Sequence, residues 1–406
     1  VAALAGAPAA RAADVVAIPA AIQPHLAIDR AGTVTIVALQ AGEWVTAQSR
    51  DGGVTFSAAQ PITHTGGKAT GGAQRGPRMG ADASDRLFIS GWLPLDERGK
   101  LIDATTADLF LIRSDDGGQH WSQPRRINAA PGLAPENLHA MAVTAAGTVH
   151  LAWLDRQDRK FGEGGQDLFY SQLRGDELAP PRKVATLICE CCAPGLAADD
   201  GGRVLISYRE GGKKASREIF YLQSTDGGRT FARPRQINSL PTGETVCPMS
   251  APIVALGTPS ASARLIWKDI RSGRNQVYCR VLPENAPTPA ELTIDAHEGA
   301  EQNHPTLTLL DGGPAWAAWS EKFDGQQGIA LVNLAQSARP LRLDSGEWSR
   351  ADYPVLAHNR GTAAGLVYEA FQGGDSAVLY HPLPAATKAA GNPRPAVRPT
   401  PAKATR

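Results

Sequence analysis

Sulfur-bearing side chains gather near the middle of the 406-residue sequence. Four of the five cysteines lie there, and a methionine follows two residues after the last of them: Cys189, Cys191, Cys192, Cys247 and Met249. Thiolate and thioether sulfur atoms are soft ligands, which suit Cu(I) first and Zn(II) second. These residues therefore predict a soft-metal site, with copper as the favoured ion.

The same cysteines have two other interpretations. In an oxidising compartment cysteines most often pair as disulfides, and Cys247 could bond to any one of Cys189, Cys191 and Cys192. A redox-active pair of thiols is the third interpretation. The fifth cysteine, Cys279, lies in the run Gln-Val-Tyr-Cys-Arg-Val, where we expect a buried spare thiol.

A second set of residues that could do chemistry is charged and follows short apolar stretches. Its members are Asp96, Asp155, Arg156, Arg209, Glu210, Asp269, Arg271, Glu321, Lys322 and Glu369. Carboxylates in such a set could serve a hydrolase as acid, base or nucleophile. The same charges could also form ordinary ion pairs between neighbouring elements, and both interpretations stay open.

The elements that position these residues recur along the chain. An octad of the form S-x-D-x-G-x-x-[WF] stands at residues 49–56, 114–121 and 224–231. Its Asp can accept hydrogen bonds from the N–H groups of its own turn, and its Gly supplies a positive φ. The starts are 65 and 110 residues apart. A period near 50 residues indicates a solenoid or a propeller.

A second pattern, P-x-[LMV]-x-x-[DN], extends the repeat over the whole body. It is clear at residues 24–29, 77–82, 194–199 and 354–359, has one extra residue at 305–311, and is looser after 138 and 252. Apolar strands are predicted after it at 33–39, 87–92, 148–153, 204–208, 264–267, 315–319 and 365–368. The seven copies of the pattern, each followed by a predicted strand, predict seven modules that form one domain, residues 13–384. The last module lacks a fourth strand, which residues 15–18 could supply.

The octads resemble the Asp-boxes, or BNR repeats, of the sialidase-like β-propeller superfamily. The resemblance implies an all-β ring whose boxes lie on turns between third and fourth strands, away from the ligand face. It also implies that the innermost strand of each blade begins at that face, where the residues before it converge. We expect seven four-stranded blades from the module count, with six, the number in sialidases, as the alternative.

The resemblance also carries an enzymatic alternative. Sialidases hold the carboxylate of the sugar with three arginines and use a Tyr–Glu pair as nucleophile. Arg75, in Arg-Gly-Pro, is the nearest match to the first arginine, while Arg209, Arg271 and Tyr353 stand where they could join it. This implies a glycoside hydrolase for acidic sugars. Only Arg75 and Pro77 match the catalytic signature, and a fold alone does not carry activity.

The leading hypothesis is therefore an exported propeller that binds copper through its sulfur cluster and is not an enzyme. The ligand would be a metal ion or a small carbohydrate. A protein-interaction scaffold with structural disulfides is the third alternative.

The two ends and the charge balance complete the prediction. Residues 1–12 resemble the end of a secretory signal, with Ala10 and Ala12 at the cleavage site, and indicate a periplasmic or secreted protein. Residues 385–406 form a basic, proline-rich tail that we expect to be disordered and that could touch an anionic envelope surface. A net charge of +1 argues against nucleic acid as a partner, and no apolar stretch is long enough to span a membrane.

Overall fold

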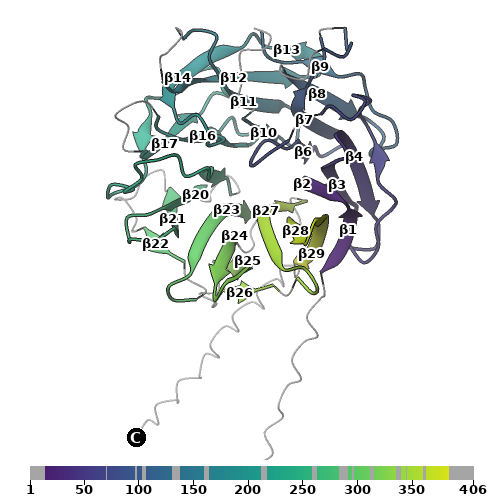
Figure 1. Ribbon diagram of the computed structural model, residues 1–406. Coiled ribbons are helices and arrows are strands. Elements are labelled where there is room, and N and C mark those ends of the chain that lie inside the picture. Colours follow the sequence, from purple (N-terminus) through teal and green to yellow (C-terminus); the bar gives the residue numbers. More distant parts are fainter. Residues whose placement is uncertain are drawn as a thin grey trace, which may run out of the picture.

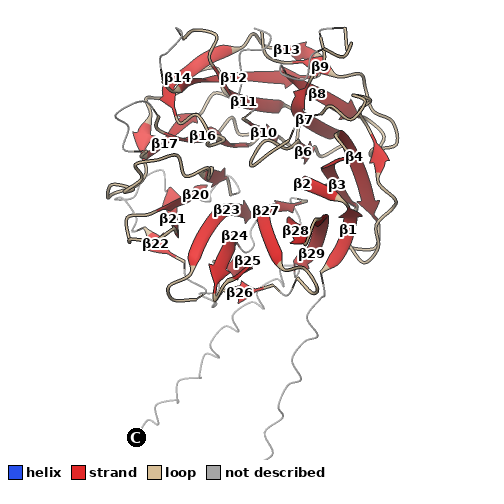
Figure 2. Ribbon diagram, viewed as in Figure 1, coloured by secondary structure: helices blue, strands red, loops and turns tan. Residues whose placement is uncertain are grey.

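The computed structural model describes residues 14–69, 71–96, 98–102, 107–129, 138–159, 164–211, 217–257, 263–282, 291–294, 297–310, 315–334, 340–343, 345–359 and 363–383. Within these residues the secondary structure is strand and turn without helix, as Figure 2 shows. It follows that this part of the chain has no helix that could cross a membrane. The predicted signal remnant, 1–12, and the predicted tail, 385–406, lie outside the described residues.

Five sheets repeat one antiparallel order, in which successive strands along the chain are neighbours. The first two sheets are β2 (Ala21–Ile28), β3 (Val34–Gln40), β4 (Glu43–Ser49) and β5 (Gln60–Pro61), and then β6 (Arg78–Ala81), β7 (Leu87–Leu93), β8 (Asp108–Ser114) and β9 (Arg125–Arg126). The third sheet is β10 (His139–Val143), β11 (Val149–Asp155), β12 (Gln166–Arg174) and β13 (Glu177–Leu178), and β14 (Arg182–Ile188) also pairs with β12. The last two are β15 (Gly195–Ala198), β16 (Val204–Arg209), β17 (Ile219–Ser224) and β18 (Arg235–Gln236), and then β19 (Ile253–Ala255), β20 (Ala263–Asp269), β21 (Gln276–Leu282) and β22 (Leu292–Thr293).

The remaining strands form one eight-stranded sheet from two antiparallel groups. The first group is β23 (Glu301–Leu309), β24 (Ala315–Phe323), β25 (Gln326–Asn333) and β26 (Leu341–Arg342). The second is β27 (Arg350–His358), β28 (Ala364–Gln372), β29 (Asp375–Leu383) and β1 (Val15–Pro19), so the N-terminal strand pairs with the last one. A single parallel bridge, Gln327 to Arg350, joins the groups.

The sheets are arranged radially around a centre, as in a β-propeller (Figure 1). The first strand of each group contacts the next, in the order β2, β6, β10, β15, β19, β23, β27 and back to β2. The strands predicted after the proline pattern are found as β3, β7, β11, β16, β20, β24 and β28. The residues that precede the proline pattern are therefore brought to the centre of the molecule.

Large aromatic side chains fill the space between neighbouring sheets. Trp92, Trp153, Trp267 and Trp319, which lie near the ends of second strands, are at most 1% exposed. The indole of Trp44 in β4 lies directly over Gly91 of β7, where a Cβ atom would overlap it. Packing of this kind joins consecutive sheets into apolar clusters.

The Asp-boxes lie between third and fourth strands, as the resemblance implies. In the first box Asp51 accepts hydrogen bonds from the Thr55 N–H at 3.0 Å and from the Thr55 hydroxyl at 2.6 Å. The Ser49 hydroxyl donates to Asp51 at 2.7 Å and accepts from the Gly53 N–H at 2.8 Å. These bonds, with those of Thr55 first, hold the pKa of Asp51 well below its usual value. The boxes at Asp116 and Asp226 repeat the arrangement.

Substitution of the two glycines of the first box distinguishes the cost of a strained backbone from the cost of a steric overlap. Both have a positive φ, 75° at Gly52 and 92° at Gly53, but a Cβ atom on Gly53 would overlap the Tyr380 ring, whereas one on Gly52 meets nothing within 4 Å. We expect Gly52→Ala to lower the free energy of unfolding by about 1 kcal/mol, and Gly53→Ala by roughly 3 kcal/mol or more. Urea unfolding of both variants measures the difference. Equal losses would contradict this packing of the box against β29.

Candidate functional site

A cavity of about 270 Å³ opens where the inner strands begin. Every first strand of the ring, or the loop directly before it, contributes to its wall. Its polar lining consists of Gln23, His25, Gln74, Arg78, His304, Thr306, Tyr353 and Glu369, among proline, alanine and aliphatic side chains. A concave, mostly apolar site with a few convergent polar groups is the usual form of a small-ligand site.

Three of these residues have the same unusual backbone. Gln23, His304 and Tyr353 have φ values of 57°, 47° and 50°, and each directly precedes a proline of the inner-strand pattern. At each of them the pairing of the inner strand with its neighbour shifts register. Left-handed backbone at non-glycine residues costs about 1–2 kcal/mol, and such strain clusters at functional sites. Here it turns three polar side chains toward the cavity.

Two carboxylates lie opposite each other on β27 and β28, Asp352 and Glu369. Asp352 is 3% exposed and accepts hydrogen bonds from His304 Nδ1 at 2.7 Å, from the Ser320 hydroxyl and from Gln327 Nε2 at 2.8 Å. Burial disfavours its ionised form, but the bonds from His304 and Ser320 outweigh burial and hold the pKa of Asp352 below its usual value. Asp352 is therefore a fixed anion that orients its neighbours.

Glu369 has the opposite electrostatic environment. It is 4% exposed and lines the cavity. Burial raises its pKa to about 7; the Gln23 N–H, which donates to Glu369 Oε1 at 2.6 Å, opposes the rise, and the charge of Asp352 adds to it. Two neighbouring carboxyl groups with pKa values pushed apart are the arrangement that assigns acid and base roles in glycosidases. Glu369 is thus the group that can exchange a proton near neutral pH.

A stacked pair of rings stands beside Glu369. The His304 and Tyr353 rings lie with centroids 4.1 Å apart and an interplanar angle of 26°. Burial, and then the charges of Asp352 and Glu369, raise the pKa of the Tyr353 hydroxyl. Because Asp352 holds the imidazole through Nδ1, the stacked phenol is positioned in turn.

The cavity also contains a cation without a counter-charge. Arg78 donates hydrogen bonds to carbonyl oxygens of Gln74 and Gly76 at 2.7 and 2.9 Å. No acidic side chain pairs with it in the part of the chain that is described. Burial lowers its pKa to about 10, so it stays charged at neutral pH. An unpaired cation in a cavity wall is suited to an anionic ligand group.

Polar atoms without partners point to a hydroxyl-rich ligand. Within the described residues, Gln23 Oε1 and His25 Nδ1 are buried and have no hydrogen-bond partner. Burial, with the charge of Arg78, lowers the pKa of His25 to about 3, so its imidazole is neutral. Buried polar atoms are normally satisfied, and a ligand with several hydroxyl groups could satisfy both.

The structure brings together only part of the predicted arginine set. Tyr353 lines the cavity, and the charge of Arg75 acts on it. Arg209 is 0% exposed, and its guanidinium donates to the carbonyl oxygens of Arg217 and Lys268. Arg271 pairs with Asp269 at 2.5 Å and with Glu291 at 2.6 Å. Arg209 and Arg271 are therefore occupied by structural contacts away from the described lining of the cavity.

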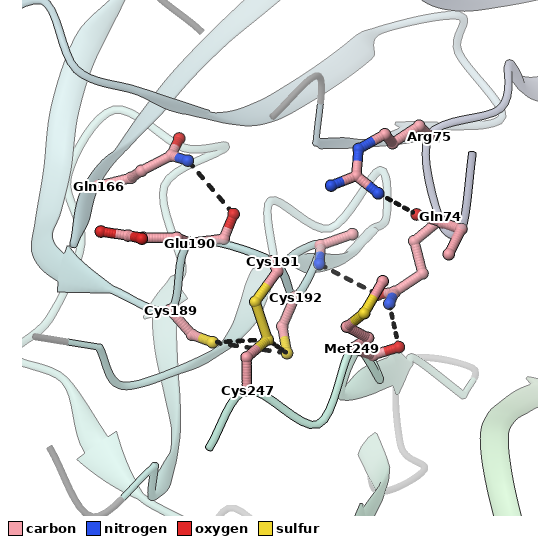
Figure 3. Close-up of a disulfide and its surroundings, with 11 residues drawn as sticks. Gln74, Arg75, Gln166, Cys189, Glu190, Cys191, Cys192, Cys247 and Met249 are labelled. Atoms are coloured by element: carbon pink, nitrogen blue, oxygen red, sulfur yellow. Dashed lines mark hydrogen bonds between the residues drawn. A yellow bond between two sulfur atoms is a disulfide. The ribbon is translucent and has the colours of Figure 1, made fainter. Parts of the chain in front are cut away.

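The predicted sulfur cluster is found beside this cavity (Figure 3). Cys191 and Cys247 form a disulfide. The sulfur of Cys189 lies 3.6 Å from that of Cys192 and 3.7 Å from that of Cys247, and the last two are 4.0 Å apart. Met249 stands beside them and is 41% exposed. Cys279 is a buried free thiol in β21, as predicted.

Hydrogen bonds and charges distinguish the two free thiols of the cluster. A bond from Cys192, opposed by burial and aided by the Cys191 N–H and by Arg217 and Arg209, lowers the pKa of Cys189 to about 6. Burial, and then the neighbouring Cys189, raise the pKa of Cys192. The carboxylate of Glu190 accepts from the Gly165 N–H at 2.6 Å and points away from the sulfur atoms (Figure 3). The local donor set is therefore sulfur.

Gln74 connects the cluster to the cavity. Its side chain lines the cavity, accepts from the Ala193 N–H at 3.1 Å and donates to the Met249 carbonyl oxygen. It thereby bridges the two cysteine segments, one before β15 and the other before β19, and Figure 3 shows its side chain beside Met249.

Sequence reasoning missed Arg78 and Asp352. Arg78 stands three residues after Arg75, which drew attention through its place before Gly-Pro. Asp352 precedes Tyr353-Pro354 as Asn303 precedes His304-Pro305. Alignment of the residues before each inner-strand proline would have drawn attention to Asp352.

Comparisons with known proteins support the fold. Residues 91–285 match the family described as BNR repeat-like domain, which confirms the sialidase-like resemblance of the Asp-boxes. No curated protein matches the sequence.

Solved structures with related folds include an ulvan lyase of a polysaccharide lyase family, with a TM-score of 0.50, 10% identity, and 92% of this chain and 94% of that chain covered. The α-L-arabinanase of Penicillium chrysogenum has a TM-score of 0.49 and 12% identity over 92% of this chain and 99% of that chain. The NanB sialidase of Streptococcus pneumoniae has a TM-score of 0.42 and 12% identity over 92% of this chain and 70% of that chain. Similarity at this level concerns the fold alone.

The raised pKa of Glu369 predicts how stability depends on pH. The folded state binds its proton up to about pH 7, whereas an unfolded glutamate loses it near 4.5. The unfolded state therefore binds fewer protons in this window, and the free energy of unfolding falls as pH rises through it, by about 3 kcal/mol in total. Glu369→Gln removes this dependence. Urea unfolding of both proteins at about pH 5 and about pH 8 measures it, and identical pH dependence would contradict it.

Proposed function

Residues 91–285 form a BNR repeat-like domain of the sialidase-like kind, and on that premise we propose that the protein cleaves glycosidic bonds of acidic sugars in its central cavity. The observation that carries the proposal is one cavity whose lining includes Glu369, Tyr353 and Arg78. The three supply a proton-transfer group near neutral pH, a phenol and an unpaired cation. The volume, about 270 Å³, lies just below the usual range of ligand pockets and suits a single sugar unit.

Glu369 is the proposed acid and base. In its protonated form it donates a proton to the glycosidic oxygen, and the resulting carboxylate accepts a proton from the attacking water. A pKa of about 7 leaves both forms populated at neutral pH. Asp352 is not assigned the second carboxylate role, because its hydrogen bonds to His304, Ser320 and Gln327 occupy it.

Tyr353 is the proposed partner of Glu369 at the reacting carbon. The stack on His304 holds this phenol at the cavity, where its neutral hydroxyl would donate a hydrogen bond to the sugar beside the reacting carbon while water makes the attack. Asp352 and His304 act as positioning residues. The strained backbone of Tyr353 and His304 is consistent with such pre-organisation.

Arg78 is the proposed site for the carboxylate of the sugar. It replaces Arg209 and Arg271 in this role because it lines the cavity, whereas those two are not among the described residues of the lining. Gln23 Oε1 would accept a hydrogen bond from a hydroxyl group of the same sugar, and His25 Nδ1 would accept from or donate to another, according to its tautomer. Arg75, next to Tyr353, would add positive potential.

The proposal also covers the closure of the propeller and the cellular location of the protein. We infer a single closed propeller of seven four-stranded blades, in which β1 completes the blade of β27, β28 and β29; the cyclic contacts of the inner strands support it. We also infer export to the periplasm or beyond, with the basic tail of residues 385–406 free to contact an anionic envelope surface. The Cys191–Cys247 disulfide is compatible with such an oxidising location.

Copper binding is the second function that we propose, and a separate observation favours it. The sulfur atoms of Cys189, Cys192 and Cys247 all lie within 4.0 Å of one another. Cys191 lies within 4.8 Å of both Cys189 and Cys247, and Met249 stands beside the cluster (Figure 3). Clusters of soft sulfur donors select Cu(I). The carbohydrate function leads because the disulfide occupies two of these donors.

The first test is a screen of chromogenic glycosides, including sialosides and uronides, with the full chain. We expect activity to decline above about pH 7, where Glu369 loses its proton. Glu369→Gln should lower kcat/KM by about 10²–10⁴-fold. Glu210→Gln is the matched control: burial also raises the pKa of Glu210, but it is not among the described residues that line the cavity, so activity should persist.

Substrate charge tests the role of Arg78. We expect Arg78→Gln to raise KM for carboxylated glycosides while KM for neutral glycosides changes little. Full activity of Glu369→Gln on every cleaved substrate, or cleavage of neutral glycosides only, would remove this version of the function.

The second test addresses copper. Protein that has been reduced and then purified anaerobically is mixed with Cu(I), freed of excess metal, and measured for bound copper and free thiols. We expect about one copper per chain and loss of reactivity of the cluster thiols. Full thiol reactivity with no bound copper under every redox condition would exclude the second function.

A further inference from the structure

Three sulfur atoms of the cluster already form most of a metal-thiolate polyhedron. The edges between Cys189, Cys192 and Cys247 measure 3.6, 3.7 and 4.0 Å. In a regular tetrahedron with metal–sulfur bonds of about 2.3 Å, the sulfur atoms are about 3.8 Å apart. The triangle therefore has the dimensions of one face of a four-thiolate site, without any movement of its three residues.

The fourth cysteine of the cluster, Cys191, is held in a disulfide. Cys191 lies within 4.8 Å of Cys189 and is joined to Cys247. A disulfide supplies no thiolate, and the thiolate is the form of cysteine that binds metal. As long as the Cys191–Cys247 bond is intact, only Cys189 and Cys192 of this cluster can become thiolate ligands.

We propose that Cys189, Cys191, Cys192 and Cys247 form a tetrahedral four-thiolate site for one soft d¹⁰ ion, Zn(II) or Cu(I), and that the site forms only after the Cys191–Cys247 disulfide is reduced. The proposal rests on the second function above and adds to it the ligand set and its redox control.

The reduction is a two-electron step with an external dithiol as reductant. The dithiol transfers two electrons and two protons to the Cys191–Cys247 bond, which breaks to give two thiols, while the dithiol closes to its own disulfide. Binding of the ion then forms four metal–sulfur bonds and releases the protons that the four cysteines still carry.

The backbone around the cluster is arranged for thiolates. Cys189 and Cys192 have the C-x-x-C spacing of structural metal loops. The N–H groups of Cys191 and Ser250 form hydrogen bonds to the sulfur atoms of Cys189 and Cys192. Backbone donors to metal-bound sulfur orient and stabilise the ligands.

Nearby positive charges and buried polar atoms without partners also support a metal-thiolate site. The positive charges of Arg209 and Arg217 act on Cys189, and they would offset the negative charge of four thiolates around a cation. Within the described residues, Arg209 Nε and Ser250 Oγ are buried and have no hydrogen-bond partner. Arg209 acts on Cys189 through its charge, and Ser250 acts on Cys192 through its backbone N–H.

Met249 is outside the proposed ligand set. Its side chain is the exposed one of the group, and its backbone oxygen is held by Gln74. Access to the site is through the partly exposed Cys191 and Cys247, because Cys189 and Cys192 are buried. The reducible bond therefore lies on the solvent side of the cluster.

The test compares the full chain as purified with the same chain reduced by a phosphine and freed of it under anaerobic conditions. Each is titrated with Co(II), with Zn(II) and with Cu(I) in the presence of a competing chromophoric chelator. We expect the reduced chain to bind one ion and to show the thiolate-to-cobalt charge transfer and intense visible bands of a tetrahedral site. The chain with its disulfide intact should show neither.

Variants identify the ligands. Cys192→Ser should lose the tetrahedral cobalt spectrum, while Cys279→Ser, which removes the buried cysteine outside the cluster, should keep it. Retained circular dichroism of each reduced variant establishes that it is folded. A Met249→Leu variant that loses the spectrum would overturn the four-thiolate set.

The experiment separates failure of the redox control from failure of metal binding itself. Equal binding by the oxidised and reduced chains would overturn the redox control and leave metal binding intact. Absence of binding by the reduced chain, which needs no variant to detect, would overturn both the site and the second function.

Discussion

Large side chains packed between neighbouring sheets hold the inner strands around one centre, and both candidate sites exist because of that packing. Trp44 of β4 lies over Gly91 of β7, and Trp92 of β7 belongs to an apolar cluster that includes Trp153 of β11. Each sheet is thereby held at an angle to the next. The cavity wall can then combine Gln23 with Glu369, two residues separated by most of the chain.

The same geometry explains why the cavity and the sulfur cluster are neighbours. The cysteines stand in the segments before β15 and β19, and three cavity residues, Gln23, His304 and Tyr353, stand directly before the inner-strand prolines of other sheets. Gln74 belongs to both, since it lines the cavity and bridges the backbone at Ala193 and Met249. A hydrolytic cavity and a metal site on one face would thus share a structural residue while using different ligand-binding groups.

Much of the fold could be predicted because its signals are local. The Asp-box requires an acceptor, a glycine and an aromatic at set spacing, and the three boxes lie on the expected turns. The site was harder to predict. Tyr353 was found through its place before a proline, but Arg209 and Arg271 were chosen by position alone, and their charges proved to be used in structural contacts. Arg78 differs from them in lining the cavity, which no sequence pattern records.

The residues themselves set the repeat, the turn chemistry of the boxes, the alternation of short strands and the concentration of sulfur donors, because each depends on neighbours a few positions away. Folding of the whole chain set which groups meet. It surrounded Asp352 with hydrogen-bond donors and buried Glu369 beside the charge of Asp352, so two carboxyl groups on adjacent strands have opposite pKa shifts. It also joined Cys247 to Cys191 rather than to Cys189 or Cys192. Burial and distance between remote segments decide such matters, and both arise only when the sheets pack.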